Sequence, residues 1–256
     1  MRQLQLTSVH LVPHAPLLLD GIGPPDADRA AIRKAAGAIP LDGDLTVMLS
    51  PHGARAGVYR AAVGSLRPQG LALVSVERPT DPVVVEELAR VWSMPVLDEP
   101  LDHGAVVALL LAEVTGPVVV ACLSEISGPD PAPVDRAIEE GDAFVRALLQ
   151  LDAPAGSFLA TAHSGAALHE RGPLGKRPQA PALEERLIAA IEHDPDALRE
   201  VAVELAREGG SCGSGVLAAL AALDEVVPGP GRIGAYGAPA GVGYVVASLP
   251  ASAATR

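Results

Sequence analysis

The stretch at 117–123 reads PVVVACL and is almost entirely apolar. A short run of this kind is typical of a β-strand buried on both faces, as the strands of a parallel sheet are. Further short runs that favour strands recur along the chain, at 7–13, 44–50, 71–76, 94–97, 157–161, 232–236 and 242–249.

Helical patterns lie between these runs. Apolar residues recur at helical spacing in 134–148 and in 183–191. A third helix is predicted at 196–207, with Asp194 and Pro195 at its start and a Gly-Gly pair at its end, and a fourth at 216–223. Alternating strands and helices predict an α/β fold with a central mixed, largely parallel sheet flanked by helices. Because no segment resembles an interdomain linker, we expect residues 1–256 to form a single domain.

Composition restricts the classes of partner. The chain has 31 acidic and 19 basic residues and a formal net charge of −12. This balance argues against nucleic-acid or anionic-membrane binding, because phosphates are neutralised by Lys and Arg. No apolar run is long enough to span a membrane, and the N-terminus lacks the layout of a signal peptide. We therefore expect a cytoplasmic protein, and the Ala-, Gly-, Pro- and Arg-rich composition suits a bacterium with a GC-rich genome.

The placement of the seven histidines is informative. His14, His52 and His163 each follow a predicted strand, and His103 opens a predicted helix. Because binding sites of open α/β sheets form at the carboxyl ends of strands, we expect these four to converge. Neutral imidazole binds metals well and transfers protons near neutral pH. The other three are expected to be structural or solvated, namely His10, His169 and His193.

The sequence around these histidines contains five short words in a fixed order. They are VPHAPL at 12–17, LSPHG at 49–53, LDHG at 101–104, AH at 162–163 and GVGY at 241–244. In this order the words resemble those of the catalytic B subunit of class III extradiol ring-cleavage dioxygenases, and they span nearly the whole chain. The resemblance implies the B-subunit fold and an oxidoreductase that opens a small aromatic diol or a related oxygenated substrate.

The resemblance also implies roles for the histidines. His14 and His52 would be two ligands of a non-haem metal, usually Fe(II) and in some relatives Zn(II). His163 would be the catalytic acid/base, and His103 would line the pocket and assist catalysis. Relatives often form homo-oligomers, so a homo-oligomer is an open expectation.

The third metal ligand departs from the family pattern. The family carries a Glu in a GECG-like word, whereas residues 209–213 read GGSCG, so that Ser211 stands in the place of the carboxylate. A neutral hydroxyl is a poor ligand for a hard divalent ion. Glu208 is one substitute. Cys212 is another, since its thiolate would favour zinc or copper, although we favour a packing role for it.

Two hypotheses follow. The first is a metal-dependent, dioxygenase-like enzyme, which the retained histidine words favour. The second is a non-catalytic descendant without a metal cofactor that binds a ligand or a protein partner, which Ser211 favours. A further departure, Ala162 where the family has a polar residue, is compatible with either.

Two other features have simpler interpretations. GGSCG also fits G-x-S-x-G, but a nucleophile elbow needs a preceding strand and a later triad histidine, and all seven histidines precede Ser211. The basic stretch 171–177 is either a solvated loop or a loop over the crevice that attracts an anionic substrate.

Overall fold

The computed structural model describes residues 4–126, 131–170, 172–223, 227 and 229–251. In these residues the main sheet has eight strands in the order β6-β3-β7-β2-β8-β1-β10-β9, and β4 and β5 form a separate two-stranded sheet. The strands are β1 (Leu6–Val12), β2 (Leu45–Gly53), β3 (Gly57–Tyr59), β4 (Ala62–Ser65), β5 (Ser75–Arg78), β6 (Val96–Leu97), β7 (Val118–Ser124), β8 (Gly156–Thr161), β9 (Arg232–Gly237) and β10 (Tyr244–Leu249).

The centre of the main sheet is parallel. Strands β7, β2, β8 and β1 are neighbours that run in the same direction. Antiparallel pairing begins on either side of them, where β10 pairs with β1 and β3 pairs with β7. This arrangement confirms the predicted α/β fold with a mixed, largely parallel sheet.

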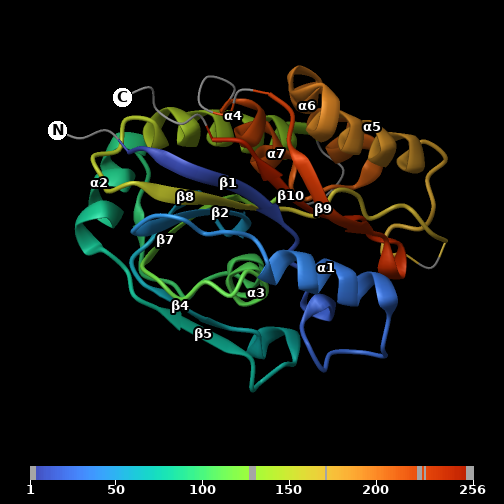
Figure 1. The fold of residues 1–256 in the computed structure, drawn as a ribbon, viewed down its shortest axis with the longest axis horizontal. Coiled ribbons are helices and arrows are strands. Elements are labelled where there is room, and N and C mark those ends of the chain that lie inside the picture. Colours follow the sequence, from blue (N-terminus) through green and yellow to red (C-terminus); the bar gives the residue numbers. More distant parts are fainter. Residues whose placement is uncertain (1–3, 127–130, 171, 224–226, 228, 252–256) are drawn as a thin grey trace.

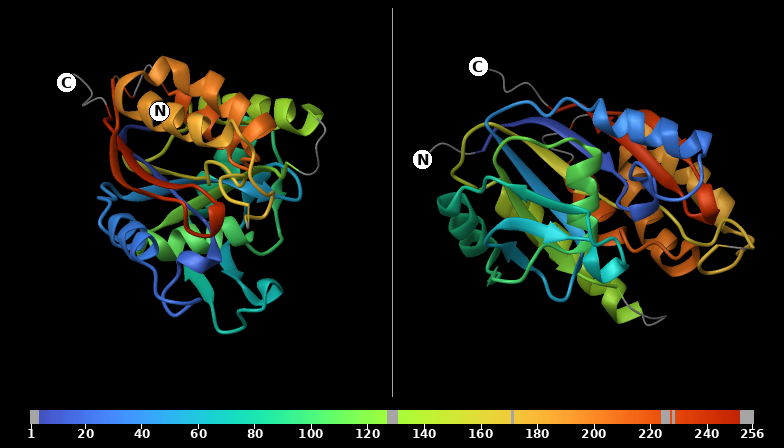
Figure 2. Two further views of the ribbon diagram at one scale, coloured as in Figure 1. Left: turned by 90° about the vertical axis from the view of Figure 1, so that its right-hand side faces the viewer. Right: turned by 90° about the horizontal axis from the view of Figure 1, so that it is seen from below.

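Helices cover both faces of the sheet (Figures 1 and 2). One face carries α4, α5, α6 and α7, and the other carries α1 and α3 together with the β4–β5 hairpin. The helices are α1 (Ala27–Gly37), α2 (Pro82–Trp92), α3 (His103–Leu111), α4 (Pro131–Leu148), α5 (Ala180–His193), α6 (Leu198–Glu204) and α7 (Ser214–Ala221). No helix in the described part of the chain is long and apolar enough to cross a bilayer.

The position of β7 in the sheet explains why its sequence is so uniformly apolar. Val119 and Ala121 pack into the core on the side of α4 and α7, whereas Val120 and Cys122 pack into the core on the side of α3. Successive side chains of a strand point to opposite faces, and here both faces are covered by helices. Every apolar residue of this strand is therefore buried, and Cys122 is one of them.

The structure revises several predicted boundaries. The strand predicted at 44–50 extends to Gly53, so His52 lies within it. The strand predicted at 71–76 is displaced to β5, which pairs with β4 outside the main sheet. The helix predicted at 196–207 is divided into a 3₁₀ turn, Pro195–Ala197, then α6 and a π-helical turn, Leu205–Gly209. Sequence periodicity did not indicate α1, α2 or β3.

Glycines allow two helices on one face to approach closely. A Cβ on Gly141 of α4 would lie 2.3 Å from the carbonyl oxygen of Gly215 in α7. Conversely, a Cβ on Gly215 would lie 2.5 Å from the carbonyl oxygen of Ala137 in α4. The two helix backbones are therefore in contact, and neither position has space for a side chain.

Replacing Gly141 with alanine should destabilise the protein. Alanine is favoured over glycine by about 1 kcal/mol in an open helix, but here the helices must move apart, and overpacking of this kind costs about 1–3 kcal/mol. We expect the midpoint of urea unfolding to fall in Gly141→Ala. Gly116→Ala is the matched control, because a Cβ there meets no atom within 4 Å. Equal midpoints for the two variants would contradict the close packing of α4 on α7.

Candidate metal centre

The parallel pairing of the central strands positions three of the expected histidines. β1, β8 and β2 are adjacent and parallel, so their carboxyl ends lie at the same edge of the sheet. His14 follows β1 by two residues, His163 follows β8 by two, and His52 is the penultimate residue of β2. His103 reaches the same edge as the first residue of α3.

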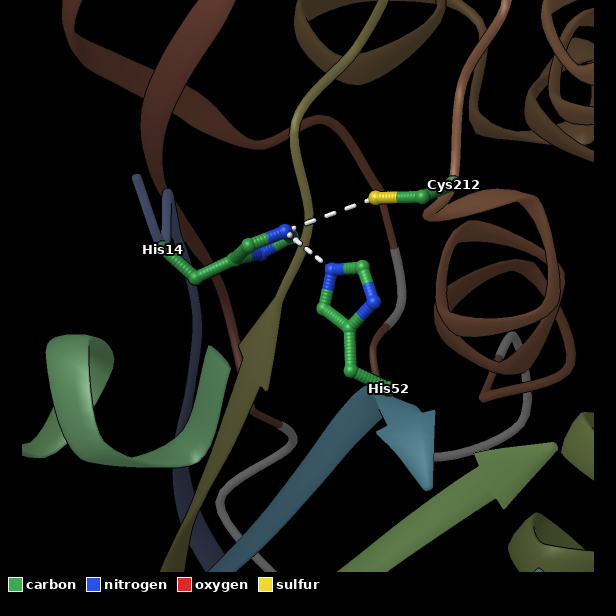
Figure 3. Close-up of side chains that lie close together, drawn as sticks. All are labelled: His14, His52 and Cys212. Atoms are coloured by element: carbon green, nitrogen blue, oxygen red, sulfur yellow. Dashed lines mark hydrogen bonds between the residues drawn. The ribbon is translucent and has the colours of Figure 1, made fainter. Parts of the chain in front are cut away.

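Two of these histidines and one cysteine form a possible set of metal ligands (Figure 3). The Nε2 atoms of His14 and His52 are 2.9 Å apart, and the Sγ of Cys212 lies 3.4 Å from Nε2 of His14. One ligand atom from each residue lies within 4.8 Å of the others. A metal ion between these atoms would have two imidazole ligands and one thiolate.

The other two predicted histidines are adjacent to this cluster. The ring centroids of His52 and His103 are 4.2 Å apart, and those of His14 and His163 are 5.3 Å apart. The structure therefore brings together all four of the histidines that were expected to converge. By contrast, His10 is buried between Ser248 Oγ and the carbonyl oxygen of Pro40, which is the expected structural role.

Each candidate ligand histidine has an oxygen near its second ring nitrogen. Nδ1 of His14 is 3.2 Å from Oγ1 of Thr161, at the end of β8. Nδ1 of His52 is 3.4 Å from a carboxylate oxygen of Glu125. With the Nδ1 atoms directed to these oxygens, Nε2 of His14 faces both Cys212 and Nε2 of His52. Groups of this kind fix the ring orientation of histidines that bind metals.

A distorted segment of backbone presents Cys212 to the histidines. The π-helical turn Leu205–Gly209 is followed by Gly210 in the left-handed region, with φ of +71°. Glycine adopts this conformation without the steric cost that other residues incur. Next, the Ser211 hydroxyl donates to the carbonyl oxygen of His163 at 2.9 Å and accepts from the amide of Gly213 at 3.0 Å. The hydroxyl therefore fixes the loop, and the following side chain, Cys212, faces the histidines.

These contacts revise the expectations for the third ligand. The Ser211 hydroxyl is engaged within its own loop. The exposed carboxylate of Glu208 accepts a hydrogen bond from Gln179 at 2.6 Å, so the structure does not bring this residue into the cluster. Cys212, for which a packing role was favoured, instead lies against His14. The sequence pattern could not show which residue is the third candidate ligand, because the turn determines which of the two adjacent side chains, Ser211 or Cys212, points toward the histidines.

Electrostatics favour the thiolate at Cys212. Burial alone would raise the pKa of this thiol, but nearby His163 and His14 outweigh that effect and hold its pKa well below the usual range. Burial lowers the pKa of His14 to about 4, which keeps that ring neutral. Burial opposes protonation of His52 as well, yet its contacts with Cys212 and Glu125 raise its pKa to about 10. A thiolate and a neutral imidazole are the forms that bind metal ions, and a metal would displace the proton from His52.

Hydrogen bonds of the preceding residue, Asp102, fix the position of His103. The carboxylate of Asp102 caps α3 by accepting from the amide of Ala105 at 3.0 Å. It also accepts from Ser50 Oγ at 2.7 Å and from the Tyr59 hydroxyl at 3.0 Å. The Asp of the LDHG word therefore holds the start of α3, and with it the backbone of His103, against β2 and β3.

Glu184 of α5 is a buried acid near His163 that the sequence did not indicate. Its side chain is 2% exposed, and one carboxylate oxygen accepts from the Ser164 hydroxyl at 2.5 Å. A Cβ on Gly243, in the GVGY word, would lie 2.4 Å from that same oxygen. Within the amphipathic pattern of 183–191, Glu184 resembled an ordinary solvated acid. The sequence feature that could have indicated this burial is Gly243, because the absence of a side chain there leaves space for the Glu184 carboxylate.

The basic stretch 171–177 has a structural role at one of its ends. Arg177 donates to the backbone carbonyl oxygens of Arg207 and Glu208, at 3.2 and 3.0 Å. It therefore caps the end of the π-helical turn that precedes Cys212. Arg171 lies outside the described residues.

Comparison with solved structures finds a similar fold. The chain is similar to an uncharacterized protein, JW3007, from Escherichia coli K12, with a TM-score of 0.60 and 18% sequence identity. The match covers 95% of this chain and 99% of that chain. At this identity the similarity shows a shared fold alone. No protein-family model matches the sequence, and no curated protein is significantly similar to it.

The buried Glu184 predicts a pH dependence of stability. Burial raises its pKa from 4.5 to about 7, against the opposing hydrogen bonds of Ser164 and Tyr236 and the proximity of His163. Between these two pH values the folded state keeps a proton that the unfolded chain releases. The free energy of unfolding therefore falls as pH rises through this window.

Replacing Glu184 with glutamine should remove this dependence. Relative to Glu184→Gln, we expect the wild type to lose roughly 3 kcal/mol of stability between pH ~5 and pH ~8, measured by urea unfolding. The exposed neighbour provides the control, and Glu185→Gln should keep the wild-type slope. Parallel pH curves for wild type and Glu184→Gln would show that this carboxyl titrates normally in the fold.

Proposed function

We propose that this chain is a metal-dependent enzyme that acts on a small oxygenated substrate, on a framework like that of the class III extradiol dioxygenase B subunit. The observation that carries the proposal is the convergence of His14, His52 and Cys212. Three ligands from one protein leave coordination positions for water or substrate, as in catalytic metal sites. His103 and His163 lie beside the cluster, where they can act on a bound molecule.

The ligand set fits Zn(II) better than Fe(II). A thiolate carries the same single negative charge as the carboxylate that the dioxygenase resemblance implies, so the net charge around a divalent ion is preserved. The ligand is softer, however, and thiolates favour zinc and copper over the ions that prefer carboxylates. The low pKa of Cys212 supports thiolate ligation.

The residues around the cluster suggest a division of roles. When bound, Zn(II) would supply Lewis-acid polarisation of a substrate oxygen or of water. His163, beside His14 and outside the ligand set, would exchange a proton with the substrate hydroxyl. His103, held from behind through Asp102, would donate a hydrogen bond to a second substrate oxygen. Both residues are half-buried, so solvent reaches part of each.

Ring-opening oxygenation of an aromatic diol is the second candidate. It is favoured by the ordered histidine words and by the proximity of all four histidines. This reaction needs a metal that reacts with O₂, which zinc does not do, so it requires that the His₂Cys set bind Fe(II). Oxygen consumption by anaerobically Fe(II)-loaded protein, measured with a panel of catechols, separates the two candidates.

Metal analysis tests the proposal directly. Protein purified without chelator should contain about one equivalent of zinc. We expect His14→Ala and Cys212→Ala to lose stoichiometric metal, because each variant lacks one of the three ligands. Both should keep the circular dichroism spectrum of the wild type. His193→Ala, at the exposed end of α5, is the matched histidine control and should keep its metal. A wild type that takes up neither Zn(II) nor Fe(II) would overturn the proposal and favour the non-catalytic, partner-binding alternative.

The identity of the third ligand should determine metal preference. Restoring a carboxylate in Cys212→Glu should lower the ratio of Zn(II) to Fe(II) affinity by about tenfold or more, because the soft donor is lost. Competition with a chromophoric chelator under anaerobic conditions measures both affinities. Cys122→Ala changes the other cysteine, on the side of β7 facing α3, and should leave the ratio unchanged. An unaltered ratio in Cys212→Glu would mean that residue 212 does not coordinate the metal.

A further inference from the structure

Glu125 occupies a fixed position beside one of the candidate ligands. It follows β7 directly, and its backbone amide donates to the carbonyl oxygen of Gly53 at 2.9 Å, which extends the pairing of β7 with β2. His52 immediately precedes Gly53. The Glu125 carboxylate consequently lies 3.4 Å from Nδ1 of His52, on the side of the ring opposite the cluster.

The end of β7 is held firmly. The carboxylate of Glu140, in α4, accepts from both the amide and the hydroxyl of Ser124, at 2.8 and 2.7 Å. The Ser124 hydroxyl also accepts from the amide of Ala56 at 3.2 Å. The backbone of the next residue, Glu125, is therefore fixed from two sides, whereas its side chain is 54% exposed and can change rotamer.

The His52 ring requires an acceptor at this position. Its Nδ1 is buried and has no partner of normal hydrogen-bond geometry among the described residues. A buried imidazole N–H without a partner is costly, and 3.4 Å is longer than a good hydrogen bond. A small rotation of the Glu125 side chain would close this distance.

We propose that Glu125 is a positioning residue of the metal centre, whose carboxylate accepts the Nδ1–H of His52 and thereby directs Nε2 of that ring to the metal. This role rests on the proposed function. The hydrogen bond selects the tautomer that can coordinate through Nε2. It also increases the basicity of the ligand nitrogen, and the carboxylate adds a negative charge near the cation.

The contacts of Glu125 distinguish it from other exposed acids nearby. Glu99 is of similar exposure, but it lies 3.5 Å from the guanidinium of Arg55 and forms an ordinary surface ion pair. Glu125 instead faces His52, with His103 and Cys212 as the other titratable groups around it. Among the described residues, Glu125 is thus the acid that faces the unsatisfied Nδ1 of His52.

Zinc affinity of matched variants tests this role. In Glu125→Ala we expect zinc affinity to fall by about 10- to 100-fold, the usual effect of losing such a partner. Glu125→Gln should lose less, because its amide oxygen still accepts the hydrogen bond without contributing charge. Glu99→Gln should bind as the wild type does. In the metal-free proteins, Glu125→Ala should unfold at a lower temperature than the wild type, because the buried Nδ1–H of His52 loses its acceptor. Glu125→Gln keeps an acceptor and should unfold close to the wild-type temperature.

NMR provides a readout that a structural role would not alter. In zinc-loaded wild type, the ¹⁵N shifts of His52 should show a protonated Nδ1 with a slowly exchanging proton, and Glu125→Ala should lose that protection. Equal zinc affinity and equal Nδ1 protection in wild type and Glu125→Ala would overturn the role of Glu125 while leaving the metal centre intact. Failure of the wild type itself to take up either Zn(II) or Fe(II) would overturn both this role and the proposed function.

Discussion

The candidate site depends on the parallel pairing of β1, β8 and β2. Neighbouring strands are about 4.8 Å apart, so β1 and β2, with β8 between them, are separated by about twice that distance. Side chains that lean over the end of β8 from both sides can meet above it, and His14 and His52 do so. At the end of β8, the Thr161 hydroxyl contacts Nδ1 of His14. The next residue, Ala162, packs against Gly213 beside Cys212, where an added Cβ on Gly213 would lie 2.3 Å from the Cβ of Ala162.

The sequence carried enough information for the sheet and for the four histidines, and the reason is local. Strands buried on both faces have a composition that is recognisable without tertiary context, and histidines that follow parallel strands must share one edge of the sheet. The identity of the third candidate ligand could not be predicted in this way. A π-helical turn and a left-handed Gly210 rotate the chain so that Cys212, and not Ser211, faces the histidines. That rotation depends on contacts with the loop that follows β8, which no spacing rule describes.

Glu125 and Glu184 were also beyond prediction, for two different reasons. Glu125 belongs to no motif, and its proximity to His52 results from the backbone pairing at the end of β7, which the sequence does not reveal. Glu184 occupies a helix position that is solvated in most amphipathic helices, but the chain after β8 covers it. The two acids also differ in charge: contact with His52 lowers the pKa of Glu125 and favours its carboxylate form, whereas burial raises the pKa of Glu184 to about 7 and favours its neutral form.

The hydrogen bond from Ser211 to the carbonyl oxygen of His163 joins two loops that carry residues of the site. Ser211 directly precedes Cys212 in one loop, and His163 lies in the other, so a displacement of one backbone is transmitted to the other. If the proposed cation binds at Cys212, it would therefore also restrain the backbone of His163, which lies outside the ligand set. A cation on one side of the site would in this way reduce the conformational freedom of the proposed acid/base on the other side.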